Sequence, residues 1–282
     1  MGGDLCARYT TLLILNLALL AISAPAQMGP GVYRSYTLVK VDPTVNEPVV
    51  IKFSIENRRP DALKVPTGSD YQGCCGFRAR ITRPDGRTEE AAPRAPIDGG
   101  AVAFASREIE PFGTYSTTLL ANKWFGFDTP GRYLLYVDNT SLLVDTTAPK
   151  SPYPTDGQIV IDVGPRDTGR LEQICADLEN RMMNTTSAAD ALEAEDVLTH
   201  ITDPVAVPHI ARVLETKETM TPFLVDALAH IGDNAAVDAL ILRLNSPWKD
   251  QDTPRSVRGA LDEIEKKTKD VTIKLKIQAS RR

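Results

Sequence analysis

The sequence predicts a multidomain protein in which an all-β antiparallel sandwich is followed by an all-α solenoid of helical repeats. Residues 27–165 contain short alternating runs of apolar and polar residues separated by turn residues, a pattern typical of strands. Residues 166–265 have helical periodicity and an internal repeat, because LTHITDPVAV at 198–207 recurs 30 residues later as LAHIGDNAAV at 228–237. An apolar leader precedes both parts. We therefore expect a removable segment and two domains.

The leader has the layout of a secretory signal peptide. Residues 11–22 are apolar, and Ala24 and Ala26 form the small-residue pattern of a signal-peptidase site. The apolar run is shorter than the roughly 20 residues that span a bilayer. Cys6 precedes this run, which argues against a lipid-modified cysteine. We expect residues 1–26 to be cleaved, and the mature chain to be periplasmic or extracellular with no membrane span.

The first domain is predicted from its strands. Apolar and polar residues alternate with period two in six segments, which are 36–41, 49–55, 77–81, 115–120, 133–137 and 158–163. Weaker candidate strands lie near Leu63 and Val102. Six to eight strands of this length favour a sandwich that is immunoglobulin-like in the broad sense. The run DTPGRYLLYVD at 128–138 resembles the Pro-Gly-x-Tyr strand entry of bacterial Ig-like modules. The resemblance implies an inward Tyr133 that ties down a corner. Residues 139–157 are expected to form a long loop.

The second domain is predicted from its repeats. Asp203 and Asp233 occupy equivalent positions, where each can accept hydrogen bonds as a helix N-cap, and Pro204 then falls at the first helical position. A weaker third copy aligns 254–264 with 221–231. Residues 187–265 resemble the short HEAT-like repeats. The resemblance implies paired helices with Leu228 and Ile231 facing the core, a capping helix over 167–183, and a scaffold that binds proteins.

Charge divides the chain further. Residues 27–165 carry 15 basic and 16 acidic residues (net −1), residues 166–265 carry 9 and 19 (net −10), and residues 266–282 carry 7 and 1 (net +6). The acidic surface disfavours nucleic acid as a partner. It is either a solvated face on which the basic tail, residues 266–282, folds back, or a charged surface that selects a basic partner or cations. Period-two alternation in the tail at 271–277 predicts a short strand. The carboxylates expected to contact a partner are Glu193, Glu195, Asp196 and Asp226.

Three cysteines remain after loss of the leader. Cys74, Cys75 and Cys175 are an odd number for an oxidising compartment. An interdomain bridge to Cys175, a vicinal disulfide between Cys74 and Cys75, and free thiols all stay open. The helical pattern places Cys175 among apolar residues, where an unpaired cysteine behaves as a small hydrophobe.

The histidines do not predict an enzyme. His200 and His230 occupy equivalent repeat positions, so we expect them roughly 8 to 10 Å apart, too far to share one metal ion. His209 falls on a different helix face. HEAT-like enzymes that bind di-iron carry His-Glu pairs, whereas isoleucine follows each histidine here, so that activity is not carried over. No nucleophile elbow, phosphate loop or His-x-x-x-His pair is present in the sequence. We expect no catalytic residue, cofactor or metal.

Two aromatic residues are candidates for recognition. Trp124 lies in the run WFGF at 124–127, and Tyr71 precedes the paired cysteines. Exposed aromatics dominate binding hot spots, although Trp124 could equally plug the end of the sandwich. The sequence predicts an exported adaptor or scaffold that binds another protein. The alternative is a secreted inhibitor or regulator of an enzyme such as a protease, acting through the sandwich loops.

Overall fold

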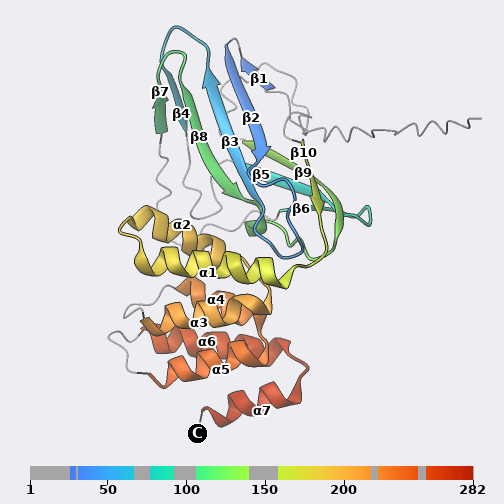
Figure 1. Ribbon diagram of the computed structural model, residues 1–282, viewed down its shortest axis with the longest axis vertical. Coiled ribbons are helices and arrows are strands. Elements are labelled where there is room, and N and C mark those ends of the chain that lie inside the picture. Colours follow the sequence, from blue (N-terminus) through green and yellow to red (C-terminus); the bar gives the residue numbers. More distant parts are fainter. Residues whose placement is uncertain are drawn as a thin grey trace, which may run out of the picture.

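The computed structural model describes residues 26–29, 31–66, 77–91, 106–139, 158–216, 222–246 and 252–281. Figure 1 shows a β region (the strands up to residue 163) on one end of a stack of helices, the helical region (168–279). Within these ranges no helix is both long enough and apolar enough to cross a membrane. The predicted signal peptide lies outside the described residues except at Ala26.

Within the described residues, the β region forms three small antiparallel sheets. One has the order β1-β2-β3-β8, the second β10-β9-β5-β6, and β4 and β7 form a separate pair. The strands are β1 (Ala26–Gly29), β2 (Val32–Leu38), β3 (Val50–Asn57), β4 (Leu63–Pro66), β5 (Phe77–Thr82), β6 (Thr88–Glu90), β7 (Ser106–Ile109), β8 (Thr114–Leu120), β9 (Gly131–Asn139) and β10 (Gln158–Val163). The six sequence segments with strong alternation all contribute strands.

Alternation along these strands builds the β core. In β3, Ile51, Phe53 and Ile55 are buried while the residues between them are more exposed, so one face of the strand is apolar. Buried residues of both four-stranded sheets form one apolar cluster. Tyr133 is fully buried at the start of β9, and its hydroxyl donates to the carbonyl of Thr129 at 2.8 Å. This bond fixes the turn that enters β9.

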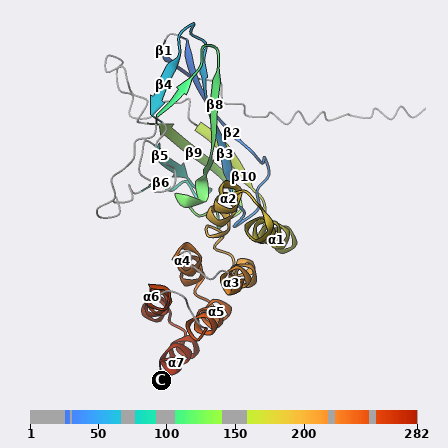
Figure 2. The same cartoon turned by 90° about the vertical axis from the view of Figure 1, so that its left-hand side faces the viewer.

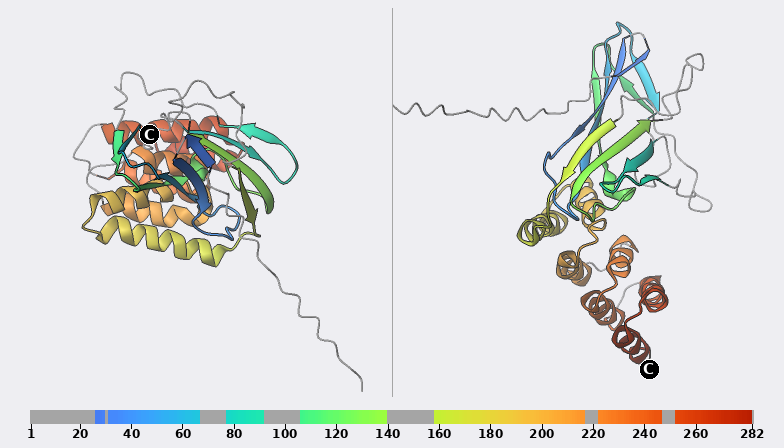
Figure 3. Two further views of the ribbon diagram at one scale, coloured as in Figure 1. Left: turned by 90° about the horizontal axis from the view of Figure 1, so that it is seen from above. Right: turned by 90° about the vertical axis from the view of Figure 1, so that its right-hand side faces the viewer.

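The helices lie in two rows. Viewed nearly along their axes, α1, α3, α5 and α7 form one row and α2, α4 and α6 the other (Figures 2 and 3). The helices are α1 (Thr168–Asn184), α2 (Ala188–Leu198), α3 (Val207–Thr216), α4 (Pro222–Ile231), α5 (Asn234–Leu244), α6 (Asp252–Lys267) and α7 (Val271–Ala279); short 3₁₀ turns are η2 (Ala121–Lys123) and η5 (Pro204–Ala206). A second apolar cluster lies between the rows.

Local side-chain hydrogen bonds start several of these elements. Asp203 caps η5 by accepting from the N–H of Val205, and Asp233 caps α5 by accepting from the N–H of Ala236. Each bond satisfies a donor that has no partner inside its own helix. The repeat in the sequence thus corresponds to two equivalent helix starts, one in η5 and one in α5.

The predicted combination of an immunoglobulin-like sandwich and a HEAT-like solenoid is wrong as a description of this fold. The immunoglobulin arrangement places seven strands in two sheets, whereas here β4 and β7 pair with each other outside the two larger sheets. Neighbouring residues determine that a segment is extended, but long-range pairing determines its partner. Only the coarse order, a β region followed by helices, remains.

The predicted strand at 271–277 is also wrong, because this segment is helix α7. Asp270 caps the helix by accepting from the N–H groups of Thr272 and Ile273. Ile273 and Ile277 are buried, whereas Val271 and Leu275 are 66% and 60% exposed. A strand would place all four of these side chains on one face, whereas here only Ile273 and Ile277 reach the core, and their spacing of four residues is that of a helix face. The helical region therefore continues past residue 265.

Candidate binding sites

The junction between the β region and the helices is built around two buried carboxylates. The first is Asp203, which is 1% exposed. Arg166 donates to its two carboxylate oxygens at 2.7 and 2.8 Å, and the amide of Asn46 donates at 3.0 Å. Burial acts to raise the pKa of Asp203, but the hydrogen bonds from Arg166, Asn46 and the N–H of Val205 outweigh it and lower the pKa to about 2.

The second buried carboxylate belongs to Glu47, a fully buried residue in the loop between β2 and β3. The ammonium of Lys40 lies 3.1 Å from one carboxylate oxygen and Nε of Arg170 lies 2.7 Å from the other. Arg170 also donates to the carbonyl of Asp42 at 2.7 Å. Because Arg170 belongs to α1, these contacts join the β2–β3 loop to the first helix and hold the two regions in a defined orientation.

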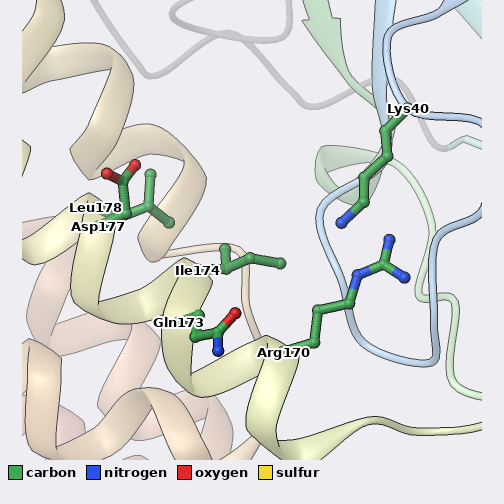
Figure 4. A pocket seen from close by; sticks show the side chains of 6 residues that line it. All are labelled: Lys40, Arg170, Gln173, Ile174, Asp177 and Leu178. Atoms are coloured by element: carbon green, nitrogen blue, oxygen red, sulfur yellow. The ribbon is translucent and has the colours of Figure 1, made fainter.

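Beside this contact lies an open depression, the α1 groove, with a volume of about 440 Å³. Figure 4 shows the head groups of Lys40 and Arg170 together at one end and Asp177 at the other, with Ile174 between them. The lining residues are Lys40, Arg170, Gln173, Ile174, Asp177 and Leu178. The groove thus offers two cations, an apolar floor and one carboxylate along α1 and the neighbouring β2–β3 loop.

A second candidate site is the Phe112 turn, residues 110–113, which joins β7 to β8 at the end of the β region remote from the helices (Figure 1). Phe112 is 71% exposed and has a φ of 59°, in the left-handed region that side-chain-bearing residues rarely adopt. The N–H of Gly113 donates to the carbonyl of Glu110 at 2.9 Å and closes the turn. An exposed aromatic side chain therefore occupies a strained backbone position.

A fully buried asparagine holds this turn in place. The side-chain amide of Asn57 donates to the carbonyls of Ile109 at 3.2 Å and Glu110 at 3.1 Å, and to that of Asp61 at 2.9 Å. Its backbone N–H donates to the carbonyl of Gly113 at 2.9 Å. These bonds connect the turn to the end of β3, so Phe112 is presented from a fixed backbone.

A polar cluster links α1 to α3, and its side chains bind one another. His209 is 1% exposed; its Nδ1 lies 2.6 Å from Glu179 and its Nε2 3.1 Å from Glu172. Arg212 donates to both oxygens of Glu179, and this bonding outweighs desolvation and lowers the pKa of Glu179. In the part of the chain that the structure describes, no group of three or more His, Cys, Asp or Glu residues could hold a metal ion.

The four carboxylates predicted to contact a partner do not form one exposed row. Glu195 is buried, and Asp196 pairs with Lys123 of the β region at 2.6 Å. Glu193 on α2 and Asp226 on α4 are exposed. The pKa of Asp226 is raised, first by partial desolvation and then by repulsion from Glu263. The row therefore reduces to separate positions on two helices.

The aromatic residues and cysteines singled out in the sequence differ in where the structure places them. Trp124 is partly buried and packs against the β core, as expected of a plug rather than a free anchor. Tyr71, Cys74 and Cys75 lie outside the described residues. Cys175 is a free, fully buried thiol, so the bridge to it is not formed. Burial, aided by neighbouring carboxylates, raises the pKa of Cys175 to about 12 and keeps the thiol protonated.

The basic tail folds back onto the acidic helices. The ammonium of Lys276 lies 2.8 Å from a carboxylate oxygen of Asp238 on α5. Arg281 pairs with Asp262 and, at 2.8 Å, with Glu265, both on α6. The tail thereby neutralises part of the acidic surface on these two helices.

Sequence reasoning missed the residues of both candidate sites. The Pro-Phe-Gly run at 111–113 signals a turn, but turn rules would place the left-handed residue at Gly113 rather than Phe112. Nothing local links Lys40 to Arg170, because they are 130 positions apart. Their proximity depends on how α1 packs against the β2–β3 loop.

Comparison with known proteins identifies no family. No family model matches the chain, and no curated protein matches it. Among solved structures, a β-glucosidase from Listeria innocua in complex with isofagomine is 14% identical, with a TM-score of 0.26 over 47% of this chain and 16% of that one. A Pseudomonas fluorescens alkylpurine DNA glycosylase bound to DNA is 10% identical, with a TM-score of 0.26 over 49% and 31%. Astrotactin-2 is 14% identical, with a TM-score of 0.22 over 84% and 37%.

The chain matches less than two thirds of the length of each of these proteins. At such TM-scores the likeness supports no statement about the fold or the activity of this chain. The assignment of function therefore depends on the candidate sites themselves.

Proposed function

We propose that this chain is an exported, non-enzymatic adaptor that binds another protein, and that the Phe112 turn is one of its partner contacts. The observation that carries the proposal is the exposure of Phe112 on a strained and fixed backbone. A left-handed conformation costs a non-glycine residue about 1 to 2 kcal/mol. Strain of this kind is typical of functional positions, and a rigidly held aromatic loses little entropy when it enters a partner's pocket.

Replacing Phe112 with glycine separates stability from binding. Glycine accepts a positive φ, so F112G should leave the free energy of unfolding within about 1 kcal/mol of the wild type, whereas F112A keeps the strained backbone. Urea denaturation of the three proteins measures this. If Phe112 served the fold, both variants would instead be strongly destabilised.

The same variant tests the proposed function. Mature wild-type chain should capture a stoichiometric protein partner from its own envelope or extracellular fraction, and F112G should capture at least tenfold less, the loss expected when a binding hot spot is removed. L242S is the matched control, because Leu242 is a 57% exposed apolar residue on α5. Equal capture by F112G and L242S would remove the Phe112 turn from the interface, and the absence of any stoichiometric partner would contradict the adaptor.

The Phe112 turn also favours a second candidate function, the inhibition of an enzyme. A rigid protruding turn is suited to enter an active-site cleft. The catalytic rate of the captured partner distinguishes the two functions. An inhibitor should lower the partner's catalytic rate when the wild type is added and leave it unchanged when F112G is added, whereas an adaptor should bind without altering that rate.

Export makes its own prediction. If the leader is a signal peptide, mass spectrometry of the native protein should find Gln27, or a residue adjacent to it, at the amino terminus. The matched control is a chain in which Ala24 and Ala26 are both replaced by arginine, which should retain the leader. A native protein that begins at Met1 would contradict export.

A further inference from the structure

The charges at one end of the α1 groove do not balance. Lys40 and Arg170 share a single buried partner, the carboxylate of Glu47, which also accepts from the N–H of Thr44. The side chains of Lys40 and Arg170 remain 43% and 32% exposed. Asp42 contributes its backbone carbonyl to Arg170, and within the described residues its carboxylate is not ion-paired with either cation. Lys40, Arg170 and Glu47 together thus carry one net positive charge, and the nearby carboxylate of Asp167 accepts from the backbone N–H of Arg170 rather than from its guanidinium.

Both cations keep donors for a ligand. Nε of Arg170 lies 2.7 Å from Glu47 in an ion pair and Nη2 donates to the carbonyl of Asp42, so among the described contacts Nη1 donates to no protein acceptor. An ammonium has three donors, and that of Lys40 uses one on Glu47. Because both head groups contact the buried carboxylate of Glu47, they are positioned before a ligand arrives. Figure 4 shows the two head groups next to each other. A ligand carboxylate can accept from both.

The other end of the groove has the opposite charge. Asp177 is exposed seven positions after Arg170 on α1, which corresponds to about 10 Å along the helix axis. In the described part of the chain no basic side chain forms an ion pair with Asp177. Ile174 lies between the two ends, and Leu178 lines the groove beside Asp177 (Figure 4). The groove therefore matches a ligand that is anionic at one end, apolar in the middle and cationic about 10 Å away.

We infer that the α1 groove binds the carboxyl terminus of a partner polypeptide that has a basic residue three positions before its last residue. The terminal carboxylate accepts charge-assisted hydrogen bonds from Lys40 and Arg170. Three steps of extended chain span about 10 to 11 Å, which brings the basic side chain to Asp177. An apolar side chain in between packs on Ile174 and Leu178. The inference stands on these contacts and not on the Phe112 turn.

The test measures binding of a labelled peptide by fluorescence anisotropy. The probe is fluorescein-Gly-Gly-Lys-Ala-Leu-Val, labelled at its amino terminus and with a free carboxyl terminus, and the mature full chain is the receptor. We expect saturable binding that weakens at least tenfold when the terminus is amidated, because a charge-assisted contact is lost. Absence of saturable binding by the free acid, or equal binding of acid and amide, would overturn the inference.

Variants locate the two ends of the peptide. K40Q should weaken binding of the free acid about tenfold, whereas K52Q, a control at an exposed lysine on β3, should not change it. D177N should weaken the lysine peptide by about two- to fivefold and leave a norleucine analogue unchanged, because an exposed ion pair is weak. Thermal melts verify that the variants are folded. Equal effects of K40Q and K52Q, or equal effects of D177N on both peptides, would contradict the assignment.

These outcomes are independent of the proposed adaptor contact at Phe112. F112G should bind the probe peptide like the wild type. Loss of partner capture by F112G with normal peptide binding would separate the two sites, whereas failure of the peptide test leaves the capture result unaffected.

Discussion

Replacing Asp203 with alanine should lower the free energy of unfolding by about 2 to 4 kcal/mol. The carboxylate is buried and accepts from Arg166, Asn46 and the N–H of Val205. A lost N-cap costs about 1 kcal/mol, and hydrogen bonds to a charged group contribute about 1.5 to 3 kcal/mol. Arg166 is half-exposed and can rehydrate, so no charge is left stranded in the interior. Chemical denaturation measures the loss.

Asp233 provides the matched control within the same chain. It occupies the equivalent repeat position and caps α5 through the N–H of Ala236 at 2.7 Å. Within the described residues no hydrogen bond or ion pair joins Asp233 to the β region, so D233A should cost only about 1 kcal/mol, the value of the cap. Equal losses from D203A and D233A would show that the bonds of Asp203 to Arg166 and Asn46 contribute nothing to stability.

The pH dependence of this contribution follows from the lowered pKa. The folded-state pKa of Asp203 is about 2, below its ordinary value of 3.8. Stability from the ionised carboxylate is therefore fully present above about pH 4 to 5 and is lost as the pH falls toward 2. The difference in unfolding free energy between the wild type and D203N should be constant near neutrality and shrink below pH 4. A difference that does not change with pH would contradict the pKa of about 2.

Replacing Leu228 with alanine should destabilise the helical region by about 2 to 5 kcal/mol. Leu228 lies on α4, is fully buried and belongs to the apolar cluster between the two helix rows. Truncation loses its transfer free energy and leaves a cavity that the packed helices fill only in part. A thermal melt followed by helical circular dichroism measures the effect.

The control for this substitution is L242A on α5. Leu242 is 57% exposed, so its truncation should cost less than about 0.5 kcal/mol. A melting temperature of L228A that matches that of L242A would show that α4 packs in a different register.

Much of the secondary structure could be predicted from local patterns. Alternation in β3 and β5, and Asp203 and Asp233 as helix starts, involve residues within a few positions of each other. The sheet arrangement could not be predicted in this way, because β4 pairs with a strand some 40 residues later. Strand identity is a local property, whereas strand partnership depends on the whole chain.

The candidate sites depended even more on tertiary structure. Of the carboxylates predicted to contact a partner, Glu195 is buried and Asp196 is paired with Lys123. A count of charged residues in the sequence treats every carboxylate alike, because burial and ion pairing arise only when the chain packs. Phe112 and the α1 groove went unnoticed for the same reason.

The sequence by itself determined six of the strands and which residues start η5 and α5, because backbone hydrogen bonds and caps depend on near neighbours. Only the tertiary structure decided that 271–277 is a helix, since burial of Ile273 and Ile277 on the preceding helices outweighs a period-two pattern. Only the tertiary structure also brought Lys40 beside Arg170 and placed Asn57 under the Phe112 turn. These contacts join segments distant in sequence, and the free energy that selects them comes from packing within the β region, within the helical region and between the two.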